Sequence, residues 1–445
     1  MRARSSKPLI DVTGIVLFLC TIFIFELLTF GSGQWSDPIL GFNLRKFVFG
    51  AILALSVIAN LNQRYPTTET ACVVFGTAFL VLIWVLLLPT FYSTRLDYAI
   101  RDALPLVGIL AVIPLKILLT DDIWNRGRLI FGASILVTAL LQIMYYIVGM
   151  TSQELVLLMV VIHRSLLDPL SLDPENAVFA STVDEITRVN WPGTSMLLLG
   201  LYIFCTTRRS EMNSVLRLLA ISIMLISLYA AQTRALQIAS LMLLSIHYFF
   251  RRFSPTRIRP IHIFSTLLCC TLLTIPILMS LDPQTLELIG ISRGGSDEDR
   301  YQQILPLINS WLNHPFFGQG FGASATLIRS EDAPFSYELF VLSLLMKVGI
   351  FGFLLLLLIL GQLTYSAIKI HRKIDSKESA WLLSLVVSIT FIGNTNPYLT
   401  SLLGTLTVIF VLLELQFRIC NTRYNHPKII PRYFTPTHLI PFSPN

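Results

Sequence analysis

Long apolar segments recur along the whole chain, and they constrain its fold more than any other feature. Hydrophobic residues make up 54% of the 445 residues and charged residues only 13%, about half the charged share of an ordinary soluble domain. Inside a bilayer the backbone must satisfy its own hydrogen bonds, and a helix of about 20 apolar residues does so while crossing. The sequence therefore predicts an all-α polytopic membrane protein, with a single membrane domain over residues 1–445.

Twelve apolar segments predict about 12 transmembrane helices. In chain order they are 10–30, 42–61, 70–90, 102–119, 129–149, 192–207, 213–231, 234–250, 261–280, 335–368, 380–397 and 399–417. The tenth is longer than one crossing needs. The turn signal Asn394-Thr395-Asn396-Pro397 separates the last two.

The distribution of lysine and arginine gives the orientation. With a cytoplasmic N-terminus, most of these residues fall on the cytoplasmic side, and twelve crossings return the C-terminal tail, 418–445, to that side. Two long loops, 150–191 and 281–334, then lie outside and are expected to contain short helices. The net charge of +7 follows from this bias and from anionic lipids, so no nucleic-acid partner is expected. The six cysteines lie in spans or on the cytoplasmic side, and their spacing predicts neither a disulfide nor a metal site.

The second long loop contains a predicted amphipathic helix. Ser296 can cap it, and the acidic residues 297–299 suit its positive N-terminal end. Apolar residues then recur at helical spacing: Tyr301, Ile304, Leu305, Ile308, Trp311 and Leu312. Pro306 is expected to kink this helix or to divide it into two short ones.

Arginines on the outward side are candidate phosphate ligands, because a guanidinium forks onto two phosphate oxygens. Arg234 opens an apolar segment and could instead reach the lipid headgroups. Arg300 and Arg293 flank the acidic triplet and could instead form local ion pairs. Arg188 could be an interface anchor beside Trp191. The candidate ligands are Arg188, Arg234, Arg293, Arg300 and Arg329.

Glu338 follows Tyr337 at the mouth of the tenth segment, and a carboxylate there suits a general base. Its alternative role is a structural ion pair with a loop arginine. Tyr337 and His314 are candidate substrate-binding residues, although His314, before Pro315, is more simply a turn residue. The glycines of residues 318–322 predict a tight turn, since a dinucleotide motif needs a strand–turn–helix context.

Three parts of the pattern resemble the O-antigen ligase and O-antigen polymerase superfamily of bacterial envelope glycosyltransferases. Thr233-Arg234 opens an apolar helix, where the family has Ser-Arg-Gly. The run Arg300 … Trp311 … His314-Pro315-Phe316-Phe317-Gly318-Gln319-Gly320 is similar to the family's Arg … Trp … His-Pro-Leu-x-Gly-x-Gly. Tyr337-Glu338-Leu339 … Lys347-Val348-Gly349-Ile350-Phe351-Gly352 resembles its last block.

One departure from the ligase pattern favours a polymerase. Ligases carry His-Asn-x-Tyr-Leu in the last block, with the histidine twelve positions, counted inclusively, before the first glycine of Gly-Leu-Ile-Gly. Counting back from Gly349 reaches Glu338. A carboxylate at this place resembles the repeat-unit polymerases. A ligase joining the same donor to lipid A core is the alternative. A transporter or flippase of lipid-linked oligosaccharides is less favoured, because the spans lack an inward row of acidic residues and histidines.

The resemblance implies a multi-pass protein of the bacterial inner membrane, with both loops in the periplasm and both termini in the cytoplasm. It implies transfer of undecaprenyl-pyrophosphate-linked glycan, with Glu338, Arg300 and Arg234 as catalytic residues. The residues that would bind substrate are Arg188, Arg293, Arg329, Tyr337 and His314. Arginines would stabilise the leaving group, so neither a metal nor a cofactor is expected. Expected partners are the lipid-linked glycans and membrane lipids, with a chain-length regulator and a flippase as candidate protein partners.

Overall fold

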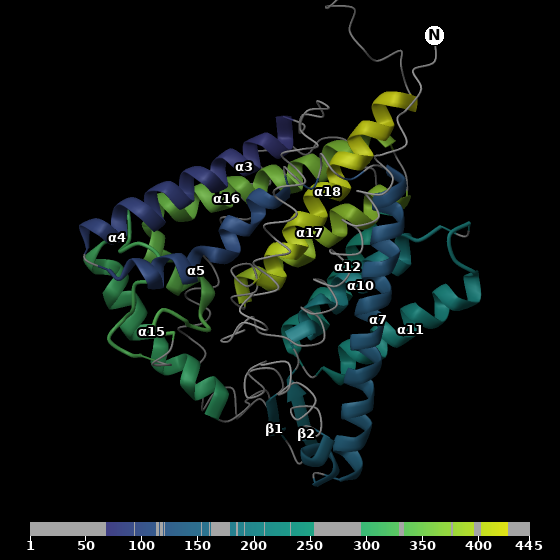
Figure 1. The fold of residues 1–445 in the computed structure, drawn as a ribbon, viewed down its shortest axis with the longest axis horizontal. Coiled ribbons are helices and arrows are strands. Elements are labelled where there is room, and N and C mark those ends of the chain that lie inside the picture. Colours follow the sequence, from purple (N-terminus) through teal and green to yellow (C-terminus); the bar gives the residue numbers. More distant parts are fainter. Residues whose placement is uncertain are drawn as a thin grey trace, which may run out of the picture.

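A computed structural model describes residues 68–161, 179–252, 295–328, 333–395 and 402–425, apart from short gaps within these ranges. These residues form a bundle of helices (Figure 1). The helices are α3 (Thr68–Val81), α4 (Leu88–Phe91), α5 (Leu96–Gly108), α7 (Asp121–Thr151), α10 (Leu197–Thr206), α11 (Ser214–Ala230), α12 (Arg234–Arg252), α15 (Gly295–Asn313), α16 (Phe340–Ile374), α17 (Lys377–Thr395) and α18 (Leu402–Asn425), with a π-helical turn η2 (Leu82–Leu87) and 3-10 turns η3 (Ile109–Ala111) and η5 (Pro192–Met196).

Among the described residues, three helical segments are long and apolar enough to cross a membrane. They are Val74–Phe91, Ile123–Thr151 and Phe340–His371. Shorter apolar helices cover Gly193–Thr206, Ser214–Ala230, Ala235–Phe249 and Ser379–Thr390. The chain is therefore a helical membrane protein. Three of the predicted spans, 10–30, 42–61 and 261–280, lie outside the described residues.

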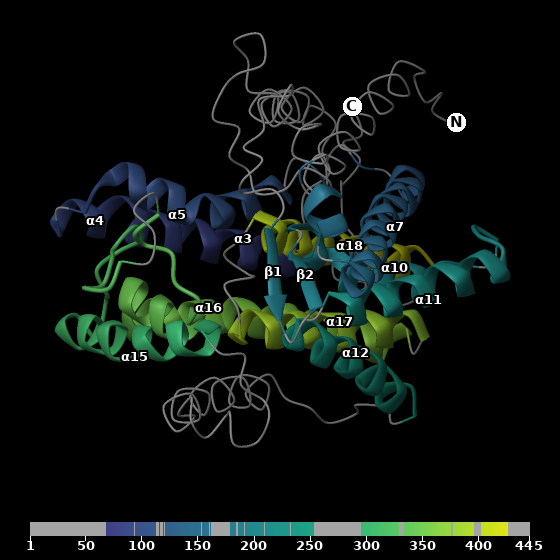
Figure 2. The same cartoon turned by 90° about the horizontal axis from the view of Figure 1, so that it is seen from below.

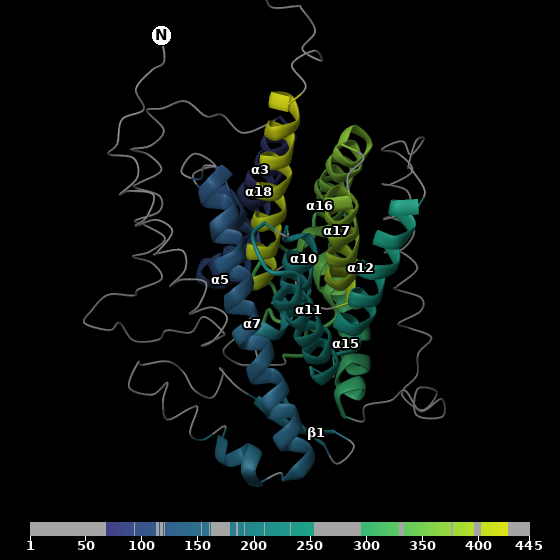
Figure 3. The same ribbon diagram turned by 90° about the vertical axis from the view of Figure 1, so that its right-hand side faces the viewer.

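Helix α16 organises the bundle. It lies beside α3 on one side and α17 on the other, and α12 packs along α17 (Figures 1 and 2). Helix α18 lies between the α5 side and the α16 side of the bundle (Figure 3). Helix α10 is buried along almost its whole length. Its own residues are apolar on nearly every face, as is typical of a helix in the centre of a bundle.

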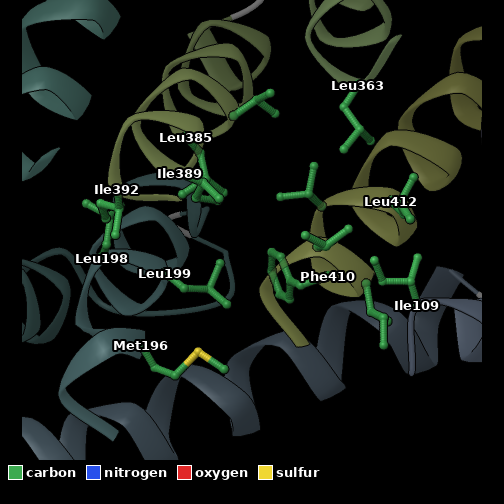
Figure 4. Packing of buried hydrophobic residues seen from close by; sticks show 14 of the residues in the cluster. Ile109, Met196, Leu198, Leu199, Leu363, Leu385, Ile389, Ile392, Phe410 and Leu412 are labelled. Carbon is green, nitrogen blue, oxygen red and sulfur yellow. The ribbon is translucent and has the colours of Figure 1, made fainter. Parts of the chain in front are cut away.

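The core is formed where α10, α17 and α18 meet (Figure 4). Leu198, Ile392 and Phe410 are fully or almost fully buried there. Many large apolar side chains on the outer faces of the bundle are exposed, among them Phe75, Leu218 and Leu241. Exposed apolar surface on this scale is what a lipid environment covers.

A buried ion cluster ties α7, α10 and α18 together. The carboxylate of Glu414 accepts hydrogen bonds from Trp124 Nε1 at 2.8 Å, from the Tyr202 hydroxyl at 3.0 Å and from Arg418 Nη2 at 2.6 Å. Arg128 Nη1 lies 3.3 Å from the same carboxylate. Glu414 is 2% exposed, so these donors replace the water that a buried charge would otherwise lose.

The first long loop contains an element that the sequence did not indicate. Strands β1 (Phe179–Val183) and β2 (Ile186–Asn190) pair antiparallel, with Phe179 opposite Asn190. This hairpin lies at the C-terminal end of α7 and contacts it (Figure 1). Residues 154–159 add a short helical turn, as expected for this loop.

Helix α15 in the second loop runs unbroken from Gly295 to Asn313, with Pro306 inside it. Only the single-helix alternative of the prediction therefore holds.

Candidate functional site

Helix α15 packs its apolar face against the start of α16. Ile304 and Leu307 are buried against Tyr337, Leu342 and Met346. Three apolar residues that were predicted to share this face, Tyr301, Leu305 and Leu312, are exposed instead, because the buried face is narrower than predicted. The packing of Ile304 and Leu307 fixes the N-terminal half of α15, and therefore Arg300, beside the segment that leads into α16.

Arg300 and Glu338 form an ion pair at this junction. Arg300 Nε donates to Glu338 Oε2 at 2.6 Å. The Glu338 backbone N–H donates to Oε1 of the buried Gln303 at 3.1 Å, which positions the carboxylate from α15 as well. The side chains are 46% and 24% exposed, so the pair is open to a ligand from outside.

Tyr337 holds the preceding loop onto the start of α16. Its hydroxyl accepts from the Ala325 N–H at 2.7 Å and donates to the Leu327 carbonyl at 3.1 Å. The Tyr337 side chain is 2% exposed. Burial raises the pKa of this hydroxyl above its ordinary value. The prediction assigned Tyr337 to substrate, whereas its observed contacts are with the loop.

A break in α16 is the second feature of the site. Gly349 has φ 61° and ψ −171° and interrupts the helix nine residues after its start. The break frees backbone groups on both sides, and the glycine turn after α15 satisfies them. Gln319 and Gly320 donate to the carbonyls of residues 346 and 347 at 3.0 and 2.8 Å. The N–H groups of residues 350 and 351 donate to those of residues 315 and 316 at 2.9 and 3.0 Å.

The turn needs glycine at three places. Gly318, Gly320 and Gly322 have φ of 69°, 89° and 80°, in the left-handed region that glycine adopts without strain. A Cβ on Gly318 would lie 2.6 Å from the Gly349 N. The tight turn predicted for residues 318–322 is therefore confirmed. The backbone at Gly318 lies so close to the backbone at Gly349 that neither residue could carry a side chain.

The turn also inserts beside the third predicted span. Trp84 Nε1 donates to the Phe317 carbonyl at 2.7 Å, and the Phe321 N–H donates to the Trp84 carbonyl at 2.8 Å. Trp84 lies in η2, where the wider π-helical turn leaves its carbonyl available. The glycine turn therefore reaches into the bundle between η2 and the break in α16.

A polar cavity of about 260 Å³ lies between α5 and the first half of α16. Lys347 Nζ lies 2.8 Å from Asp102 Oδ2, and the Gly322 N–H donates to the same oxygen at 2.9 Å. The Lys347 and Asp102 side chains are only 9% and 10% exposed. Arg101, Ser336 and Ser343 complete the polar lining. The prediction included neither Lys347 nor the two α5 residues. A lone lysine inside an apolar segment was the signal that could have found them.

A second charged pair lies at the outer end of α5. Arg95 Nη2 is 2.8 Å from Asp97 Oδ2, and the Arg95 guanidinium lies over the Tyr98 ring, 4.2 Å from its centroid. Hydrogen bonds from Arg95 lower the pKa of Asp97 below its ordinary value. Both side chains are largely exposed, so this pair contributes little to stability.

The other predicted site residues are placed as follows. His314 packs its ring against Tyr92, with centroids 4.6 Å apart, and its carbonyl accepts from the Gly318 N–H, as a turn residue does. Arg234 is the first residue of α12 and Arg188 lies in β2, but their side chains are outside the described part of the structure. Arg293 and Arg329 lie outside it entirely. Of the predicted catalytic residues, the structure describes the side chains of Arg300 and Glu338, and it brings these two together.

Residues 219–357 match a family model described as O-antigen ligase. The match runs from within α11 through α12, α15 and the glycine turn to the middle of α16, and it includes Arg234, Arg300 and Glu338. Arg101 and Asp102 lie before it. No curated protein matches the chain.

Proposed function

We propose that the protein polymerises repeat units of a surface polysaccharide. The match of residues 219–357 to the O-antigen ligase family model supports this class of reaction. The protein transfers an undecaprenyl-pyrophosphate-linked glycan onto a lipid-linked repeat unit at the periplasmic face of the inner membrane. The observation that supports this most directly is the contact between Arg300 and Glu338 at 2.6 Å. It joins a candidate base to a candidate phosphate ligand at one open junction.

In the proposed reaction an acceptor hydroxyl attacks the anomeric carbon of the donor. The bond from that carbon to the pyrophosphate oxygen breaks, and the lipid pyrophosphate leaves with the electron pair. Glu338 takes the hydroxyl proton, and Arg300 and Arg234 stabilise the charge on the leaving group. Arginine in place of a metal ion suffices here because the leaving group needs only cationic hydrogen-bond donors.

The ion pair itself suggests how the base is released. Before the donor binds, Arg300 holds Glu338. A pyrophosphate carries more negative charge than a carboxylate and competes for the same guanidinium. Binding of the donor therefore frees Glu338 for the acceptor hydroxyl, so the base becomes available only when the leaving group is in place.

The topology is part of the proposal. Twelve spans with both termini in the cytoplasm put the Arg300–Glu338 junction on the periplasmic side, where lipid-linked glycans are used. A reporter fused after His371 is expected to be active in the cytoplasm, and one inserted at Thr326 in the periplasm. The opposite pair of results would refute the orientation and, with it, the location of the site.

A ligase is the second candidate, because the matching family model is described by that activity. Polymerase and ligase share the donor and differ in the acceptor. Deletion of the gene, followed by a gel of the surface polysaccharide, separates them. A polymerase deletion leaves one repeat unit on the core, and a ligase deletion leaves none. Unchanged long chains would exclude both. Partners such as a chain-length regulator or a flippase would be found by copurification.

A further inference from the structure

The polar cavity between α5 and α16 lies next to a second, apolar cavity. This smaller cavity of about 60 Å³ is lined almost entirely by apolar side chains. Phe340 and Leu344 line both cavities, and Pro105 of the first is followed in the chain by Leu106 of the second. The two cavities therefore share part of their lining, and we call the pair the seam.

The polar cavity suits an anionic headgroup. The Lys347 ammonium group is held 2.8 Å from the Asp102 carboxylate. It also lines the cavity, where its remaining N–H donors can bind an anion. Arg101 also lines it, and the structure shows no acidic partner for Arg101 among the described residues. Two serine hydroxyls, from Ser336 and Ser343, add further donors.

The size and depth of the cavity indicate a headgroup rather than a whole ligand. Its volume of about 260 Å³ lies below the range of about 300–1,000 Å³ for drug-sized ligands. Lys347 lies seven residues into α16, roughly 10 Å below the helix start at about 1.5 Å per residue. A phosphate held at that depth has hydrocarbon-like surroundings beside it, where an acyl or isoprenoid chain fits.

The cavity is adjacent to the proposed catalytic pair but separate from it. Tyr337 lines the cavity, and the next residue is Glu338, yet neither Glu338 nor Arg300 lines it. Glu338 therefore pairs with Arg300 and directly follows a residue that lines the cavity of Arg101 and Lys347.

We propose that this seam binds a second polyprenyl-linked substrate, the one that carries the acceptor sugar. Arg101 and Lys347 hold its phosphate, and the first part of its isoprenoid chain passes Phe340 and Leu344. The proposal rests on the polymerase function, because a polymerase uses polyprenyl-linked substrates as both donor and acceptor. Such an enzyme needs a second phosphate site near its base.

The test counts lipids bound to the purified full-length protein by native mass spectrometry, with undecaprenyl phosphate as the probe. The wild-type protein is expected to bind two molecules. Arg101→Gln is expected to weaken one of them about tenfold, the effect of losing one charged hydrogen bond. Arg95→Gln is the matched control, since Arg95 lies on the same end of α5, is also exposed and does not line the cavity. It is expected to bind like the wild type.

A second variant, a lipid without phosphate and two competitors test the same site. The double variant Asp102→Asn/Lys347→Gln removes both members of the buried pair, so neither charge is left alone, and it is expected to lose the same lipid. Undecaprenol, which lacks the phosphate, is expected to bind at least tenfold more weakly at this site. Phosphatidylglycerol is expected not to displace the molecule of undecaprenyl phosphate whose binding depends on Arg101, and inorganic pyrophosphate is expected to displace only the other molecule.

Several results would overturn the proposal. These are two tightly bound lipids in Arg101→Gln, equal binding of undecaprenol, or displacement of the Arg101-dependent lipid by pyrophosphate or phosphatidylglycerol. None of them depends on the polymerase activity. Conversely, a site that binds as expected, in a protein whose deletion leaves the surface polysaccharide unchanged, would leave the lipid site standing and reject the proposed function.

Discussion

Replacing Gly349 by alanine tests whether the break in α16 is a property of this residue. Its φ of 61° with ψ of −171° belongs to a region that is almost restricted to glycine, and another residue held there costs about 1–3 kcal/mol. A Cβ at this position would also lie 2.5 Å from the Gly318 N, so the turn must move away. Four backbone hydrogen bonds cross this contact. Loss of two of them adds about 1–3 kcal/mol.

The expected destabilisation is therefore about 2–6 kcal/mol, measured as a lower midpoint of thermal unfolding in detergent. Gly361→Ala is the matched control. It lies in the same helix, and a Cβ on Gly361 would have no neighbouring atom within 4 Å, so alanine there should be neutral or stabilising by up to about 1 kcal/mol. Equal midpoints for Gly349→Ala and the wild type would refute the reasoning, because the break would then persist without glycine.

Substitutions at Glu338, at Arg234 and Arg300, and at Glu414 have definite expected outcomes. Glu338→Gln should fold and insert normally but yield only single-repeat surface glycan, while Glu338→Asp keeps partial activity; wild-type chain lengths in Glu338→Gln would make the carboxylate structural. Arg234→Ala and Arg300→Ala should each reduce the rate of polymerisation by about 10²–10³, with incomplete rescue by lysine because an ammonium lacks the fork; full activity in either variant removes that arginine from the site. Glu414→Gln should lower the free energy of unfolding by about 3 kcal/mol, because it removes a buried carboxylate that pairs with Arg128 and Arg418; an unchanged unfolding midpoint would contradict this account of the cluster.

Hydropathy predicted the positions of the described helices well, because a backbone in lipid has few alternatives to a helix. The amphipathic pattern of α15 predicted the helix and the burial of Ile304, but Tyr301, Leu305 and Leu312 of the predicted apolar face are exposed. The hairpin of β1 and β2 was missed. Its strands are five residues long, and they lie in a polar loop where no apolar face is required.

The break in α16 could not be predicted from its own segment. Gly349 and Gly352 lie in an apolar run, where glycine is common without breaking a helix. What makes the break stable is the backbone of residues 315–320, in the loop that precedes the helix. The Asp102–Lys347 pair is likewise separated by 245 positions. Contacts of this kind depend on which helices become neighbours, and no local pattern encodes that.

The dependence of α16 on the glycine turn has a consequence for biogenesis. The freed backbone groups around Gly349 would each cost several kcal/mol in lipid without their partners. A newly inserted α16 would therefore be an unbroken helix until the preceding loop has folded against it. The break can form only when the turn docks beside Trp84 and takes over those hydrogen bonds. The site is thus assembled after membrane insertion, in a step that converts a continuous helix into a discontinuous one.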